Sequence, residues 1–116
     1  MSSAEWAGRD LGRRTVAWSE RDVILYALAV GARPEQLDLV FEDRLRVLPT
    51  FGLTLAQWAP DVVAEAGAWE VGRAVHGSQS LQMRGEIPPW GEVELHARVG
   101  NVWDKGAAAV FEIEVA

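Results

Sequence analysis

The sequence predicts an α+β fold in which an antiparallel sheet packs one apolar face against a largely apolar helix. Two observations carry this prediction. Apolar residues follow a helical spacing over residues 19–30 and again over residues 51–58, but they alternate with polar residues after residue 80. Alternation leaves one sheet face polar, which is typical of antiparallel sheets. The chain has 116 residues and no internal repeat, so one domain with a shared core is expected.

Composition and charge exclude several classes of protein. The chain has no Cys and only two His, so disulfides and thiolate metal sites are excluded and no metal is expected. Its net charge of −6 lacks the basic footprint of a nucleic-acid binder. No apolar run of about 18 residues would span a membrane, and the start has no apolar signal-like stretch. We therefore expect a soluble, cytoplasmic protein that uses no cofactor.

The first predicted elements are a short strand and a well-marked helix. Residues 1–14 are polar and are expected to form a flexible N-terminal segment. Residues 15–18 are β-prone. Ser19 is a typical N-cap, and Asp22 three residues later can complete a capping box. Apolar residues follow at helical spacing, and Gly31 is a natural stop for the helix.

The middle of the chain is less regular. Residues 37–42 predict a short strand, and Pro49 marks a turn. After that turn one helical face carries Phe51, Leu55 and Trp58. We predict a mostly buried helix that ends at Pro60, with a further short helical turn over residues 61–67.

Three segments of the last third alternate apolar with polar residues and predict half-buried strands. They cover residues 81–84, 92–99 and 111–115. Residues 88–91 join the first two of these segments. Asp104-Lys105-Gly106 joins the last two, with residues typical of a hairpin turn. The expected order is therefore helix, second helix and antiparallel meander.

Four short segments, in their order and spacing, resemble a known family. They are Trp18-Ser19-Glu20-Arg21-Asp22 running into Tyr26-Ala27-Leu28, then Leu48-Pro49-Thr50-Phe51-Gly52, His76-Gly77-Ser78-Gln79 and Val102-Trp103-Asp104-Lys105-Gly106. The ordered set is similar to the N-terminal, non-catalytic hot-dog repeat of the MaoC-family R-specific enoyl-CoA hydratases of the peroxisomal multifunctional-enzyme type. The resemblance implies a hot-dog domain over residues 15–116, with a curved antiparallel sheet wrapped around a central helix. It also implies the hydration of trans-2-enoyl-CoA to (3R)-3-hydroxyacyl-CoA, as in the β-oxidation of fatty acids or steroid side chains.

The same comparison of residues indicates that the catalytic groups are missing. In the family's catalytic repeat, a Gly-Asp-x-Asn-Pro-x-His pattern follows the first helix and supplies the acid and base of the hydration. Here that place reads Gly31-Ala32-Arg33-Pro34-Glu35-Gln36-Leu37. Ala32 fills the Asp position and Leu37 falls near the His position, and neither can transfer a proton. We therefore expect no catalytic residue in this domain, and we favour solvated surface positions for Glu35 and His96.

The resemblance implies contact with the CoA thioester for His76, Gly77 and Lys105. The chemistry suits this role, because glycine admits close backbone approach, lysine brings a mobile charge for a phosphate, and histidine can donate or accept near the thioester arm. From the residues alone, a bend glycine and an ordinary turn lysine stay open as alternatives. Arg73 and Arg84 are further local positive charges. Candidates for lining an acyl tunnel, although their helical spacing more often marks a core, are Leu48, Phe51, Leu55 and Trp58.

Three functions stay open at this point. The first is the acyl-CoA-binding half of a hydratase, which acts beside a catalytic chain. The second is a stand-alone homodimeric binder of acyl thioesters. The third, less favoured, is a hot-dog thioesterase that uses Asp61 or Glu65. A lone hot-dog sheet has an open edge, so we expect a homodimer or a heterodimer with a catalytic MaoC-type hot-dog chain.

Overall fold

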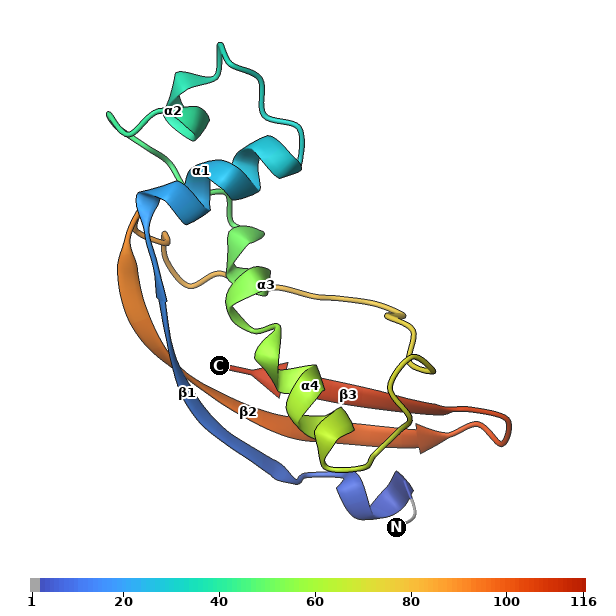
Figure 1. Ribbon diagram of the computed structural model, residues 1–116. Helices are drawn as coiled ribbons and strands as arrows, with labels where there is room; N and C mark the ends of the chain where they lie inside the picture. Colours follow the sequence, from blue (N-terminus) through green and yellow to red (C-terminus); the bar gives the residue numbers. More distant parts are fainter. Residues whose placement is uncertain (1–2) are drawn as a thin grey trace. The chain divides into compact units, whose positions relative to one another are not determined.

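The computed structural model describes residues 3–116 and contains short helices and one three-stranded sheet (Figure 1). The elements are η1 Ser3–Trp6, β1 Asp10–Trp18, α1 Glu20–Ala29, α2 Leu37–Val40, α3 Phe51–Leu55, α4 Trp58–Glu65, β2 Gly91–Asp104 and β3 Ala109–Val115. The sheet has the order β1-β2-β3, and β2 runs antiparallel to β3. The predicted α+β class is confirmed.

The described chain divides into two compact units. The first unit comprises the residues up to Arg14 together with Ala56–Gln79 and Glu94–Ala116. The second unit comprises Thr15–Leu55 and Ser80–Val93. Each unit has its own buried apolar cluster, and each is described below by itself.

The start of α1 forms the predicted capping box. Ser19 has an extended backbone, and its Oγ accepts a hydrogen bond from the Asp22 backbone N–H at 3.4 Å. The Ser19 backbone N–H donates to Asp22 Oδ2 at 2.8 Å. Both bonds satisfy donors that the first helical turn leaves free. At the other end, Gly31 has a φ of 107°, and the N–H that follows it, on Ala32, donates to Ala27 O at 2.8 Å. Gly31 is thus the stop that the sequence predicted.

The core of the second unit forms where α1 meets the segment around α3. Val23, Leu45 and Phe51 are buried together. Tyr26 packs edge-on against Phe51, with 5.6 Å between ring centroids, and its hydroxyl is 2.7 Å from Thr50 Oγ1. The partly buried residues packed against this cluster are Trp18, Ile24, Tyr26, Val47, Leu55 and Ile87.

The core of the first unit forms around Trp6, Val63 and Val99, all at most 2% exposed. Helix α4 contacts β3 in this unit. Trp69 meets Phe111 edge-on, with 5.1 Å between ring centroids. The amphipathic spacing in α4 and the alternation in β2 therefore bury their apolar positions together.

Regular structure begins before the expected boundary at Thr15. The expectation of a flexible segment over residues 1–14 is corrected for η1 and for the first half of β1; residues 1 and 2 lie outside the described residues. The indole of Trp6 supplies the large buried apolar surface that anchors this part of the chain. The alternation that marks a strand is absent at Arg13 and Arg14, so the pattern predicted only the last residues of β1.

Two further element predictions are wrong. Residues 37–42 contain the short helix α2 instead of a strand, with Leu39 buried. A short apolar run fits either element, and packing against α1 decides for the helix. The second predicted helix does not end at Pro60, because Pro60 lies in the first turn of α4, where a missing N–H costs nothing. The break instead lies between Leu55 and Trp58.

The sheet contains two of the three strands predicted in the last third. Segments 92–99 and 111–115 lie within β2 and β3. Segment 81–84 is not a strand, and β1 supplies the third strand instead. Leu81 and Met83 are 42% and 39% exposed. These apolar side chains therefore do not pack on a core as the inward residues of a half-buried strand would. The predicted turn is present: Gly106 has a φ of 83°, and its N–H donates to Asp104 Oδ1 at 2.8 Å.

Candidate functional site

His76 and Gly77 lie on the long connection between α4 and β2 (Figure 1). Every residue from 70 to 86 in this connection is exposed. The His76 Nε2 atom lies 2.8 Å from the carbonyl oxygen of Ser78, two residues later. A Cβ added at Gly77 would meet nothing within 4 Å. The Gly77 backbone is therefore open to a close neighbour, which is what a ligand-contacting glycine requires.

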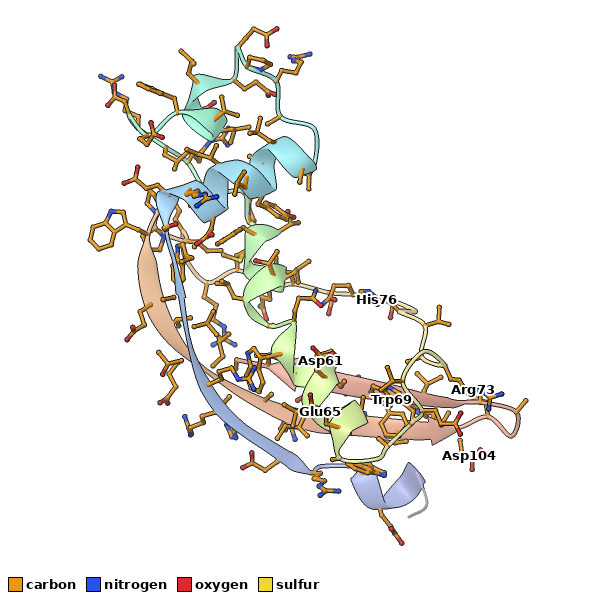
Figure 2. All side chains as sticks on the ribbon, viewed as in Figure 1. Asp61, Glu65, Trp69, Arg73, His76 and Asp104 are labelled. Carbon is orange, nitrogen blue, oxygen red and sulfur yellow. The ribbon has the colours of Figure 1, made fainter. Side chains whose placement is uncertain are left out.

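Lys105 lies in the tight turn between β2 and β3. Its backbone N–H donates to Ala108 O at 2.8 Å, which fixes the turn while the side chain stays exposed. Within residues 3–116, no hydrogen bond or ion pair joins Lys105 to His76. Figure 2 shows His76 on the long connection and Asp104, the neighbour of Lys105, at the end of β2. The role of all three predicted contact residues stays a prediction.

Residues 31–37, which stand where the family's catalytic pattern would be, run from the end of α1 to the first residue of α2. Ala32 is half-buried behind Gly31, and Leu37 is the first residue of α2, 59% exposed. The backbone N–H of Arg33 donates to Gln36 Oε1 at 2.8 Å, so this loop is held by an amide rather than an acid. Glu35 is exposed and makes no hydrogen bond or ion pair with the described residues. Nothing on this loop pairs an acid with a base.

A pair that sequence reasoning missed joins β1 to β2. His96 Nε2 lies 3.0 Å from Asp10 Oδ1, and the same oxygen accepts the Gly12 N–H at 2.6 Å. The hydrogen bond from Gly12, followed by that from His96, holds the pKa of the Asp10 carboxyl below its ordinary value of 3.8. Arg13 and Glu94 form an ion pair at 3.0 Å beside it. Both exposed pairs link β1 to β2. The paired residues are more than 80 positions apart in the sequence, so no local pattern predicts them.

A hollow of about 690 Å³ lies within the second unit. Its lining residues are Leu45, Arg46, Val47, Pro49, Met83, Gly85, Glu86, Ile87, Pro88 and Pro89. The lining residues come from two segments that are far apart in the sequence, residues 45–49 and residues 83–89. Most of these lining residues are apolar. Leu45, Val47 and Ile87 also belong to the core cluster of this unit, so its floor is continuous with the core. Six of the lining residues, Arg46, Pro49, Met83, Gly85, Glu86 and Pro88, are exposed, so the hollow is open to solvent along much of its rim.

Two local contacts fix the Pro88 wall of the hollow. The Trp18 indole N–H donates to the Pro88 carbonyl at 2.8 Å. A Cβ added at Gly91 would lie 3.2 Å from the Trp18 ring, so the chain after Pro88 passes close to the indole. Ile87 in turn packs 3.3 Å from the Cβ position of Gly52. The wall is thus held by the end of β1 on one side and by α3 on the other.

The polar groups of the hollow carry opposite charges. Arg46 Nε and Nη2 donate to Asp38 Oδ2 at 3.1 and 2.9 Å, and the Arg46 backbone N–H donates to Asp38 O at 2.7 Å. Glu86 makes no hydrogen bond or ion pair with the described residues. Both charged side chains are exposed to solvent, and the Arg46 side chain is 66% exposed although it pairs with Asp38.

The four residues predicted to line an acyl tunnel do not line this hollow. Phe51 and Leu55 belong to the core cluster of the second unit. Trp58 is 8% exposed in the first unit, with the Arg14 guanidinium 4.9 Å from its ring centroid. Its indole N–H is buried without a hydrogen-bond partner in the described residues. Helical spacing marked these positions as apolar, but it did not separate core residues from lining residues.

The carboxylates of the thioesterase hypothesis lie elsewhere. Asp61 and Glu65 are exposed residues of α4, four positions apart (Figure 2). Neither lines the hollow. The described residues contain no group of three or more side chains that could hold a metal ion. Among the same residues, no helix has the length and apolar character to cross a membrane.

The fold is that of a hot-dog protein. A MaoC-like dehydratase from Phytophthora capsici superposes with a TM-score of 0.65 over 97% of this chain and 42% of that one, at 15% sequence identity. The particular family follows from sequence. A family model described as the MFE-2 hydratase 2 N-terminal domain matches residues 17–116, and the chain belongs to this family. The predicted hot-dog class and the resemblance are both confirmed.

Known relatives are longer than this chain. Enoyl-CoA hydratase ChsH3 from Mycobacterium tuberculosis is 34% identical in an alignment 104 residues long, which covers 82% of this chain and 36% of that protein. The peroxisomal multifunctional enzyme type 2 of Mus musculus is 32% identical over 93% of this chain and 16% of its own length. The 3-hydroxyacyl-thioester dehydratase Y of M. tuberculosis is 30% identical over 77% of this chain and 32% of that protein. The chain thus spans about a third or less of each of these relatives.

Proposed function

We propose that this chain is the acyl-CoA-binding half of an R-specific enoyl-CoA hydratase or dehydratase, which works only beside a catalytic hot-dog partner. The observation that carries the proposal is an open hollow with mostly apolar lining residues, in the same unit as Ala32 and Leu37. The hollow suits an acyl chain, whereas Ala32 and Leu37 cannot activate water or protonate a carbon. The names of the relatives, which are hydratases and a dehydratase of acyl thioesters, support the same reaction class.

The CoA end of the substrate is assigned to His76, Gly77 and Lys105. The open backbone at Gly77 can lie against the thioester arm, and the free ammonium of Lys105 can meet a phosphate. A net charge of −6 does not attract CoA from a distance, so local cations must do so. Arg73 is a weaker candidate than Lys105 for binding a phosphate, because its Nε already lies 3.5 Å from Glu70 Oε2.

The need for a partner is supported by the sheet. In the described chain β3 is an edge strand, with only β2 beside it. An edge strand presents unpaired backbone donors and acceptors that a further strand can use. We propose that a catalytic MaoC-type hot-dog chain, in the same polypeptide or a separate one, pairs there. A cytoplasmic location stays a prediction.

The test is hydration of a short trans-2-enoyl-CoA, followed as the loss of enoyl thioester absorbance. The chain alone is expected to show no turnover, and adding a catalytic chain with an intact Gly-Asp-x-Asn-Pro-x-His pattern is expected to produce it. A catalytic chain whose Asp is replaced by Asn is the matched control. Turnover by the isolated chain would overturn the non-catalytic assignment. Binding of acyl-CoA by a stable homodimer that gains no activity from the partner would instead support a stand-alone thioester binder.

A further inference from the structure

Helix α1 exposes an apolar face on the side away from its buried residues. Its sequence from Val23 to Val30 is apolar or aromatic at every position, so most of the helix has no polar side. Only Val23 and Ala27 of this helix are buried. A helix that is apolar all round is typically covered all round. The other side of α1 is therefore a candidate interaction surface.

The exposed face is a narrow stripe along the helix. Leu25 is 52% exposed and Leu28 is 47% exposed, and a spacing of three positions places them on one side of α1. Arg21 precedes Leu25 by four positions, so it lies on the same side in the first turn. The exposed Arg21 side chain makes no hydrogen bond or ion pair with the described residues. The stripe thus starts with a cation that has no partner within residues 3–116.

The other end of the stripe has the complementary charge. The carbonyl oxygens of residues 26–28 accept hydrogen bonds from the chain that follows α1. Those of Ala29 and Val30 accept none from the described part of the chain. Free carbonyls give a helix end a partial negative charge, and no basic residue lies in the last turn of α1. One end of the stripe therefore offers what the other end lacks.

We infer that two copies of this chain pack together through α1, antiparallel and related by a two-fold axis between Leu25 and Leu28. In this register Leu25 of each copy meets Leu28 of the other. Positions 21 and 32 are equally far from the axis, so Arg21 lies just past the last helical turn of the second copy. Its guanidinium then donates to the carbonyls of Ala29 and Val30 in that copy.

The charges favour a second copy over other occupants. An apolar helix face that binds a membrane surface is usually flanked by basic residues, but the first turn of α1 contains Glu20 and Asp22 and the chain has a net charge of −6. An antiparallel copy joins the cation and the free carbonyls twice and places each helix dipole against an opposite one. The contact uses no residue of β3 and does not depend on the proposed binding of acyl-CoA.

The first experiment is sedimentation equilibrium on the intact chain across micromolar concentrations, where we expect a monomer–dimer equilibrium. Leu25→Asp and Leu28→Asp each place a carboxylate in the apolar contact, and each is expected to weaken dimerisation at least about tenfold. Arg21→Met keeps an apolar stem without the charge and is expected to weaken it by roughly threefold to tenfold. The matched control is Val71→Asp, because Val71 is 86% exposed and lies outside α1. Thermal unfolding checks that each variant is folded.

The second experiment measures the register of the two helices. The chain has no Cys, so introduced cysteines report on this contact alone. In a mixture of Leu25→Cys and Leu28→Cys chains, the disulfide between the two variants is expected to form faster than a disulfide within either variant. The antiparallel register brings positions 25 and 28 of different copies within bridging distance, whereas parallel helices would favour bridges between identical positions.

Each result decides for or against the inference. A monomer at every concentration would overturn it, and so would a dimer that survives both Leu25→Asp and Leu28→Asp, since another surface would then hold the copies together. Faster bridging of identical positions would refute the antiparallel arrangement. If Leu25→Cys bridges to a Cys variant of an added catalytic hot-dog chain in preference to a second copy, this face belongs to that chain instead. The hydration assay tests the proposed function separately from all of these outcomes.

Discussion

The indole N–H of Trp18 donates to the carbonyl of Pro88 at 2.8 Å, and this bond ties the end of β1 to the wall of the hollow. The two residues are far apart in sequence, so the bond sets a tertiary relationship and not a local turn. The same indole ring lies against the chain at Gly91. Trp18 therefore both positions and packs the segment that follows the hollow.

Trp18→Phe keeps most of the ring but leaves the Pro88 carbonyl without its donor. We expect the free energy of unfolding to fall by about 1–2 kcal/mol, since a hydrogen bond is lost and some packing with it. Acyl-CoA affinity should also fall, because the Pro88 wall loosens. Trp90→Phe is the control, because Trp90 is 66% exposed and should change stability by less than about 0.5 kcal/mol. Equal effects of the two substitutions in urea titrations would contradict this assignment.

Gly31→Ala tests the stop of α1. Gly31 has a φ of 107°, a conformation that a residue with a Cβ adopts only with strain, although no atom lies within 4 Å of that Cβ. The backbone alone should then cost about 1–2 kcal/mol, measured as a lower unfolding free energy. A neutral result would mean that the loop after α1 relaxes freely.

Gly77→Ala is the matched substitution at the proposed ligand contact. A Cβ at Gly77 meets nothing within 4 Å in the unliganded chain, so stability should stay within about 0.5 kcal/mol of the parent. Affinity for acyl-CoA is expected to fall, because the added methyl would occupy the space of an approaching thioester arm. Unchanged affinity in calorimetry would remove Gly77 from the contact set.

Lys105→Met tests a phosphate contact. The side chain is exposed and unpaired with described residues, so its loss should leave the unfolding curve in place. Affinity for acyl-CoA should fall by roughly threefold to tenfold at low salt, and the difference should shrink as salt screens the charge. Affinity for the matching acyl-pantetheine, which lacks the nucleotide phosphates, should not change. A similar loss with both ligands would assign Lys105 to the thioester arm instead.

The Asp10 carboxylate should make stability depend on pH at the acid end. Its pKa is lowered below 3.8, chiefly by the Gly12 N–H and then by His96, so the folded chain favours the charged form. That contribution is fully present above the ordinary pKa of 3.8 and is lost as the pH falls through the lowered value. The stability difference between the parent and Asp10→Asn should therefore shrink as the pH falls below about 5. A difference that holds down to about pH 2 would contradict this account.

The sequence predicted local features better than distant ones. The capping box at Ser19 and Asp22 was readable because both partners lie within one helical turn. The hairpin turn at Gly106 was readable for the same reason. Residues 37–42 and 81–84 were misassigned because a short alternating or apolar run does not reveal which surface it will cover.

The candidate site required the structure for a related reason. Arg46 and Glu86 come from segments that only the fold brings to one hollow, so no spacing rule connects them. The same holds for Asp10 and His96, which pair across two strands. The predicted contacts His76, Gly77 and Lys105 came from the family resemblance, and the geometry of an unliganded chain does not test a ligand contact.

The edge strand β3 also bears on how the chain behaves in a crowded solution. Glu112 and Glu114 occupy alternate positions of this strand; Glu112 Oε1 accepts a hydrogen bond from the Asn101 N–H at 3.3 Å, and Glu114 forms an ion pair with Arg98. Two identical edges placed side by side would bring these carboxylates together, and like charges in register oppose pairing. The edge therefore discourages fibre-like self-association of this chain. A strand with lysine or arginine at the facing positions would escape that repulsion.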